Sequence, residues 1–275
     1  MARTGPTTIA LPPFAGATRR LILILVGVFF ADALLALVLP QRLYGMLAGN
    51  LALVPAEVLH GQVWELLSYC VLPLGMVGTL FACLTIWFFG SMLEDVRGER
   101  WLAELFLTSS VGGAVVGCLV AYTHLFGMRP ELAAEAGPYT GIYGLFIAVA
   151  VLLGDMEFLL LFVVRIKAKY LVAIYVLVNI ATLLKASNAF GALMHLSGAL
   201  AGYLYLRYAP RRGYGFSLSE RVYALRNEYY RAKRRQAAKK FEVYMRKQNR
   251  EVHFDKNGKY VEPDDRDPND KRWMN

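Results

Sequence analysis

Long apolar blocks separated by short polar stretches run through most of the chain. Each block holds about 15 to 20 mostly apolar residues, and a helix that crosses a bilayer needs about 20. The blocks predict six membrane spans, at residues 21–39, 74–93, 101–122, 139–153, 170–184 and 189–208. Pro40 ends the first span, and a shorter apolar piece at 156–164 separates the fourth from the fifth. The pattern predicts an all-α membrane protein.

Basic residues are unevenly divided between the two sets of loops that six spans create. One set consists of the two terminal segments and the loops after the second and fourth spans. It includes Arg19, Arg20, Arg97, Arg100, Arg165, Lys167 and Lys169. The opposite set holds only Arg42, Arg129 and Lys185. Since Lys and Arg concentrate in cytoplasmic loops, both termini are expected in the cytoplasm. We expect a multi-pass protein of the bacterial inner (cytoplasmic) membrane.

The composition excludes two other classes of protein. Hydrophobic residues make up 56 % of the chain and charged residues 19 %, whereas soluble domains are roughly 45–50 % apolar and about 25 % charged. This excludes an ordinary soluble enzyme. The three cysteines, Cys70, Cys83 and Cys118, lie in or beside predicted spans, which indicates buried thiols rather than a disulfide-rich secreted module.

Nearly all of the net charge of +9 lies at one end of the chain. Residues 211–275 hold 18 basic and 10 acidic side chains, a net charge of +8. We therefore predict a cytoplasmic N-terminal segment at 1–20, a membrane domain at 21–210 and a basic cytoplasmic tail at 211–275. Apolar residues at helical spacing predict that the tail begins as a helix. An irregular stretch or a short hairpin around Asn257-Gly258 is expected to follow.

Asp32 and His195 are ionisable residues well inside predicted spans, where burial is costly without a partner. Asp32 lies midway along the first span, and we expect it to pair with a neighbouring span or to border a water-filled cavity. His195 lies in the sixth span. A satisfied interior histidine and a functional one are both open interpretations of His195.

Glycines recur at helix-packing spacing in the fourth and sixth spans. Gly137, Gly141 and Gly144 mark the start of the fourth span, and Gly198 and Gly202 follow His195. Small residues let two helices approach closely. We expect the fourth and sixth spans to meet near His195, and close packing is the simplest role for these glycines.

The motifs of the membrane domain form an ordered series. They are Trp64-Glu65-Leu66-Leu67, Val71-Leu72-Pro73-Leu74-Gly75, Trp87-Phe88-Phe89-Gly90, Leu93-Glu94-Asp95-Val96-Arg97-Gly98, the glycine-rich run at 137–144, Lys167-Ala168-Lys169-Tyr170 and His195-x-x-Gly198-x-x-x-Gly202. Over residues 15–210 this series resembles the six-span core of the rhomboid intramembrane serine proteases. The resemblance implies a six-span rhomboid-like helical bundle, with Glu94 and Arg97 fixing the loop after the second span.

The resemblance also implies where a catalytic dyad would lie. Active members carry a Ser nucleophile in a Gly-x-Ser-Gly motif at the start of the fourth span and a His base on the sixth. His195 matches the base, and Gly137 matches the first Gly of the nucleophile motif. The nucleophile position falls on Tyr139, and the next position falls on Thr140.

The residues that hold the oxyanion in active members are missing as well. Their positions on the second span fall on Gly78 and Ala82, which have no side-chain donor. The Trp-Arg pair of the outer loop appears here as Trp64-Glu65. Because nucleophile and donors are lost together, the resemblance is to a catalytically inactive member with a vestigial site. A structural hydrogen bond from Tyr139 to His195 is expected to plug that site.

Two functions remain open at this stage. A rhomboid-like pseudoprotease would bind transmembrane helices of client or partner proteins without cleaving them, as a subunit or assembly factor of a membrane complex. Alternatively, an active endopeptidase would use Thr140 as an atypical nucleophile. One step along a helix rotates a side chain by about 100°, which would turn Thr140 away from His195.

The remaining features indicate partners rather than cofactors. Residues 220–250 hold 11 basic and 3 acidic side chains, which suits anionic lipid or a cytoplasmic protein. Nucleic acid is the least favoured partner, because no recognition motif accompanies the charge. His60 and His124 have no Cys or carboxylate at metal-ligand spacing, so no metal and no cofactor are expected.

Overall fold

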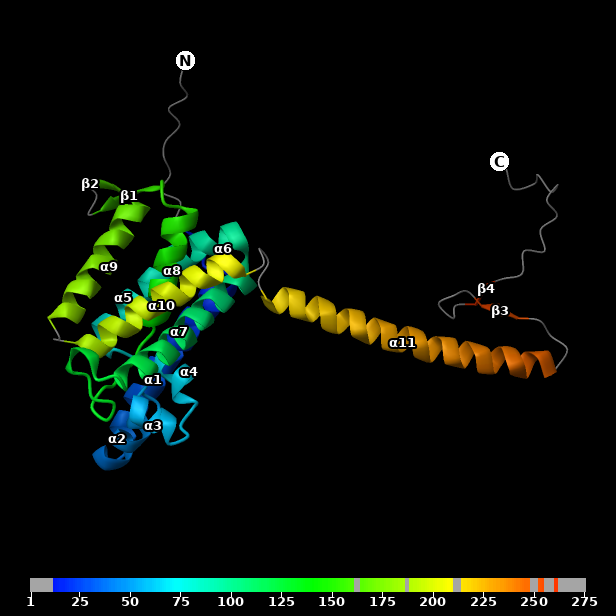
Figure 1. The fold of residues 1–275 in the computed structure, drawn as a ribbon, viewed down its shortest axis with the longest axis horizontal. Helices are drawn as coiled ribbons and strands as arrows, with labels where there is room; N and C mark the ends of the chain where they lie inside the picture. The colour runs from blue at the N-terminus through cyan, green and yellow to red at the C-terminus, as the bar shows by residue number, and fades with distance from the viewer. Residues whose placement is uncertain are drawn as a thin grey trace, which may run out of the picture. The chain divides into compact units, whose positions relative to one another are not determined.

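The computed structural model describes residues 12–160, 164–185, 188–209, 214–247, 252–254 and 260–261, and they are mainly helical (Figure 1). Three long apolar helices are α1 (Gly16–Val38), α7 (Glu99–Ala121) and α10 (Ala189–Tyr208). A fourth, Gly75–Arg97, joins α5 (Gly75–Thr85), the π-helical turn η2 (Ile86–Gly90) and α6 (Ser91–Arg97). These four are long and apolar enough to cross a membrane. The prediction of an all-α membrane protein is confirmed.

Two shorter apolar helices accompany them, α8 (Tyr139–Leu152) and α9 (Ala168–Leu184). They correspond to the two predicted spans that were shortest in the sequence. The apolar piece at 156–164 contributes to an antiparallel hairpin of β1 (Glu157–Leu160) and β2 (Val164–Lys167), which the sequence pattern did not reveal. Beside the hairpin, Asp155 contacts Lys169 at 2.9 Å and Lys167 at 3.7 Å, and these cations lower the pKa of its carboxyl.

The loop between the first two long helices is itself structured. Its helical elements are α2 (Gln41–Gly49), α3 (Pro55–Leu59), α4 (Glu65–Ser68) and the 3-10 turn η1 (Tyr69–Val71). A further 3-10 turn, η3 (Leu125–Gly127), follows α7. An isolated antiparallel bridge between Leu53 and Glu135 joins the loop before α3 to the segment that leads into α8.

The chain divides into two structural units, Met1–Gly215 and Phe216–Asn275. Helix α11 (Tyr214–Lys247) begins two residues before the second unit and forms most of its described part. The strands β3 (His253–Phe254) and β4 (Tyr260–Val261) follow and pair antiparallel. The predicted boundary at 210/211 lies outside the described residues. So do most of the predicted N-terminal segment and the acidic end of the tail, residues 262–275.

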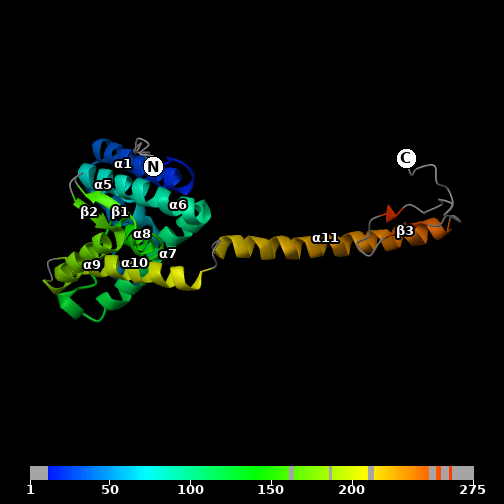
Figure 2. The ribbon, with the colours of Figure 1, turned by 90° about the horizontal axis from the view of Figure 1, so that it is seen from above.

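The core of the first unit is the contact of α7, α8 and α10, seen in the middle of the bundle in Figures 1 and 2. A Cβ at Gly198 would collide with the backbone oxygen of Thr140 and lie 2.7 Å from its methyl group. A Cβ at Gly202 would lie 2.8 Å from Cα of Gly144. The missing side chains therefore set how closely α8 and α10 approach.

A carboxylate on α6 fixes the beginning of α1. Glu94 accepts hydrogen bonds from the backbone N–H groups of Ala17 and Thr18, both at 3.0 Å, and from Oγ1 of Thr18 at 2.7 Å. The helix has no side-chain cap of its own, so Glu94 satisfies donors that would be orphaned and places negative charge at the positive end of the helix. Gly16, at φ +55°, leaves room for this carboxylate. Nearby, the guanidinium of Arg97 lies 5.5 Å from the ring centre of Trp101.

Substituting Gly198 with Ala should destabilise the bundle, because the new methyl group meets backbone rather than a movable side-chain end. Overpacking of this kind costs about 1–3 kcal/mol. Gly27→Ala on α1 is the matched control, since nothing lies within 4 Å of a Cβ there. Unfolding of both variants in the same detergent measures the difference. Equal stability of the two would contradict the close contact of α8 with α10.

Candidate functional site

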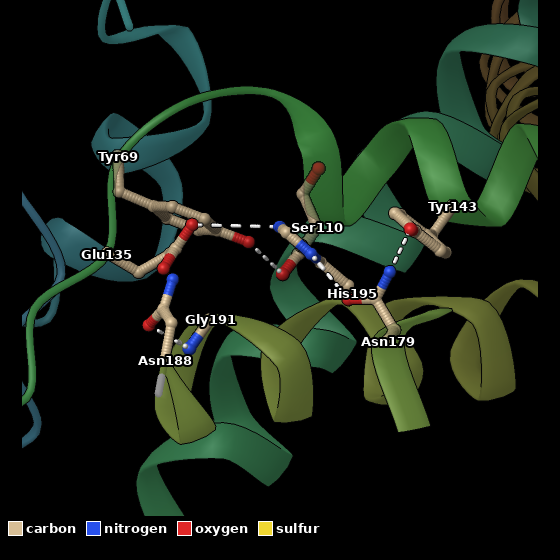
Figure 3. Close-up of polar contacts among 8 residues, drawn as sticks. All are labelled: Tyr69, Ser110, Glu135, Tyr143, Asn179, Asn188, Gly191 and His195. Atoms are coloured by element: carbon tan, nitrogen blue, oxygen red, sulfur yellow. Dashed lines mark hydrogen bonds and ion pairs between the residues drawn. The ribbon is translucent and has the colours of Figure 1, made fainter. Parts of the chain in front are cut away.

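His195 lies on α10 and is surrounded by side chains from α8, α9 and the segment before α8 (Figure 3). Its ring stacks on that of Tyr143, with ring centres 5.0 Å apart and planes 4° from parallel. Its Nδ1 lies 3.1 Å from Oδ1 of Asn179 on α9. The imidazole is therefore held on one face and at one nitrogen.

The amide of Asn179 sets which nitrogen of His195 carries hydrogen. The Asn179 Nδ2 donates to the Tyr143 hydroxyl and, at 3.2 Å, to the Tyr175 carbonyl. With both amide donors directed there, Oδ1 is left to accept, so Nδ1 of His195 is assigned as the donor. In the neutral ring, Nε2 is then a hydrogen-bond acceptor.

Nε2 of His195 is directed toward a carboxylate rather than a nucleophile. Glu135 Oε1 lies 3.6 Å away, and the two side chains are only 18 % and 13 % exposed. Nε2 has no hydrogen-bond partner among the described residues. The contact is attractive when the imidazole carries a proton. Sequence reasoning missed Glu135, Asn179 and Tyr143, since no motif spacing connects them to His195.

Tyr139 passes beside His195 without a hydrogen bond to it. The ring centres are 6.0 Å apart, tilted by 57°, and the Tyr139 hydroxyl donates to the Gly78 carbonyl of α5 at 3.4 Å. The predicted Tyr139–His195 hydrogen bond is therefore wrong. Tyr139 is long enough to reach past the imidazole to the backbone of α5, where Gly78 has no side chain. Ala82, one turn further along α5, is buried.

Thr140 lies in a different environment from Tyr139. It is fully buried, and its methyl group fills the space left by Gly113 on α7 and Gly198 on α10. In the part of the chain that the structure describes, its Oγ1 has no hydrogen-bond partner. The rotation by one residue thus places Thr140 in a helix–helix contact, where a peptide substrate has no access.

The segments that carry the other predicted residues pack at the edge of this site. Gly137, at φ +104°, donates its N–H to the Tyr69 carbonyl at 2.8 Å and packs against the Leu74 side chain. Its positive φ favours glycine at the turn into α8. Trp64 is 53 % exposed and donates Nε1–H to the Asn50 carbonyl at 3.0 Å.

Glu65, the residue that follows Trp64, is buried. Its Oε2 accepts the Val54 N–H at 2.9 Å, and Oε1 has no partner among the described residues. Burial raises the pKa of this carboxyl. The acid therefore braces the loop between α2 and α4 and supplies no positive charge to a reacting group.

The other predicted polar residues lie outside this site. Asp32 accepts a hydrogen bond from the Tyr44 hydroxyl at 3.0 Å, so its partner is on the short helix α2 rather than on a neighbouring span. His60 ends α3, and Nδ1 of His124 lies 3.3 Å from the Met128 carbonyl. Among the described residues, no group of three or more His, Cys, Asp or Glu side chains could hold a metal ion.

Comparison with known proteins places the chain in a family. Residues 22–226 match the family described as eukaryotic integral membrane protein, DUF1751. The chain is also 29 % identical over 166 residues to Rhomboid-like protein 19 of Arabidopsis thaliana, a match that covers 59 % of this chain and 53 % of the plant protein. The chain thus spans about half the length of this curated relative. A eukaryotic family gives no support to the expected bacterial inner membrane. The chain belongs to the DUF1751 family of eukaryotic integral membrane proteins, and the rhomboid resemblance is confirmed.

Proposed function

We propose that the protein is a rhomboid-like pseudoprotease that binds transmembrane segments of client or partner proteins without cleaving them. In this proposal α8 and α9 complete a six-span bundle with both termini in the cytoplasm. One observation carries it: His195 is retained at the position of a base, yet no Ser, Thr or Cys among the described residues hydrogen-bonds to it.

Serine-type proteolysis needs a nucleophile within about 2.6–3.2 Å of its base and donors aimed at the developing oxyanion. Here His195 faces Asn179 and Glu135 instead. At the second-span positions, the Gly78 carbonyl is an acceptor already engaged by Tyr139. Among the described residues, no hydroxyl or thiol hydrogen-bonds to His195, and Thr140 is buried between helices; both observations favour the pseudoprotease over an active endopeptidase.

The surroundings of the site suit a helix-binding role. Tyr139 reaches α5 through the Gly78 carbonyl, and the Tyr143 hydroxyl donates to the Tyr175 carbonyl of α9 at 3.5 Å. Helix α5 packs on α1, and α9 packs on α10 and α8. Each leaves apolar side chains exposed, Val77 and Phe81 on α5 and Ile174 and Val178 on α9. A client helix that enters between α5 and α9 would meet tyrosines rather than a nucleophile.

The native protein should not react with a fluorophosphonate probe, because no hydroxyl near His195 is activated. Tyr139→Ser alone should remain unreactive, since the oxyanion positions still carry Gly78 and Ala82. Gel fluorescence after labelling measures this, with His195→Ala as the control. Labelling of the native protein that disappears in His195→Ala would overturn the proposal.

A photo-crosslinking amino acid at Val77 on α5 or Val178 on α9 should capture membrane-protein partners. The matched controls are Leu37 on α1 and Leu119 on α7, which are at least as exposed but lie away from the site. Mass spectrometry of the adducts is the measurement. The same adducts at comparable yield from all four positions would reflect random collision in the bilayer and contradict a helix-binding site between α5 and α9.

Helix α11 is proposed to dock a cytoplasmic protein. Its aromatic side chains Tyr223, Tyr229, Tyr230, Phe241 and Tyr244 are all about half or more exposed. The Arg226 guanidinium lies 5.3 Å from the ring centre of Tyr223 and 6.0 Å from that of Tyr230. Exposed aromatic rings beside arginine are typical of protein-binding surfaces, whereas an electrostatic lipid anchor needs only the charge.

Tyr229→Ala with Tyr230→Ala should release the cytoplasmic partner as fully as deletion of residues 217–275, while binding to anionic vesicles is kept. The matched variant Lys233→Gln with Arg234→Gln keeps the rings and removes charge. Co-purification in mild detergent and vesicle sedimentation measure the two activities. If the deletion left co-purification unchanged, α11 would have no docking role.

A further inference from the structure

A groove of about 650 Å³ lies between α1 and α7, and none of the residues around His195 line it. Its walls are mainly apolar, and part of the loop between the first two long helices, residues 64–71, contributes to them. The main apolar contacts come from Leu21 and Leu25 on α1, Ala103 and Leu107 on α7, and Leu67 and Val71 on α4 and η1. Clefts of roughly 300–1,000 Å³ are the usual size for a bound small molecule.

The polar side chains that the loop contributes to the groove are already hydrogen-bonded. Ser68 donates its hydroxyl to the Leu51 carbonyl at 2.8 Å, and Trp64 donates Nε1–H to the Asn50 carbonyl at 3.0 Å. The polar atoms that these two lining residues carry are thus already satisfied by backbone. Hydrocarbon suits this part of the groove.

The end of the groove where α1 and α7 both begin carries the charge. Arg20 and Glu99 form an ion pair of 3.5 Å, with side chains 68 % and 43 % exposed. An exposed pair of this kind is weak, and a guanidinium has five donors, so Arg20 keeps donors for another acceptor. Arg100 also lines the groove, and it forms no ion pair with any carboxylate in the described ranges. This end therefore holds one positive charge in excess.

We propose that this groove binds a phospholipid, with an acyl chain between α1 and α7 beneath α4 and the anionic headgroup on Arg20 and Arg100. The apolar wall and the cationic mouth match the two parts of such a molecule.

Native mass spectrometry of the full chain in mild detergent, titrated with phosphatidic acid or phosphatidylcholine, tests the proposal. Arg20→Gln with Arg100→Gln should weaken phosphatidic acid binding by roughly tenfold, since each cation near an anionic headgroup contributes several-fold. Phosphatidylcholine binding should change little. Ala103→Phe, which fills the groove, should weaken binding of both lipids.

Arg42→Gln is the matched control, because Arg42 is an exposed arginine on α2 that does not line the groove. Inorganic phosphate should not compete, which separates a lipid from a free anion. Unchanged phosphatidic acid affinity in the double arginine variant would overturn the proposal. So would an equal loss in Arg42→Gln, because the effect would then be one of surface charge in general.

Discussion

The close approach of α8 and α10 is the constraint on which the rest of the membrane unit depends. It is possible only because Gly144, Gly198 and Gly202 have no side chains at the contact. In a bilayer, helices gain little from burying apolar surface against each other, so tight van der Waals packing must hold them together. The same contact fixes the rotation of α8, which directs Thr140 into the interface and Tyr139 across His195 toward α5.

The imidazole of His195 is largely enclosed, and one of its two nitrogens has a hydrogen-bond partner among the described residues. Asn179 accepts from one nitrogen while Tyr143 covers one face of the ring. Glu135 stands before the other nitrogen, at a distance that becomes an ion pair when the ring is protonated. The residues that surround His195 thus form a cluster of polar and aromatic side chains from three segments of the chain.

Much of the membrane unit could be predicted from the sequence, because apolar blocks and intramembrane polar residues depend on local composition. The rotation of Thr140 followed from helix geometry alone. The rest needed contacts between distant segments. Helix α1 begins at Gly16, five residues before the predicted span, and Glu94 accepts hydrogen bonds from its first N–H groups. No residue near Gly16 in the sequence indicates this contact. Asn179 and Glu135 contact His195 from two other segments of the chain. The hydroxyl of Tyr139 donates to the backbone carbonyl of Gly78, and a backbone acceptor has no sequence signature.

The π-helical turn at Ile86–Gly90 has a further consequence for the long helix Gly75–Arg97. A π turn accommodates one extra residue, which corresponds to about 100° of rotation along an α-helix. The half with Gly78 can therefore face α8 while the half with Glu94 faces the start of α1. The π turn sets the rotation of one half relative to the other, so its length is constrained as well as its side chains, of which Ile86 is fully buried and Gly90 lies against Thr18. A one-residue deletion there would turn one half away from its partner, even though every contact residue was still present.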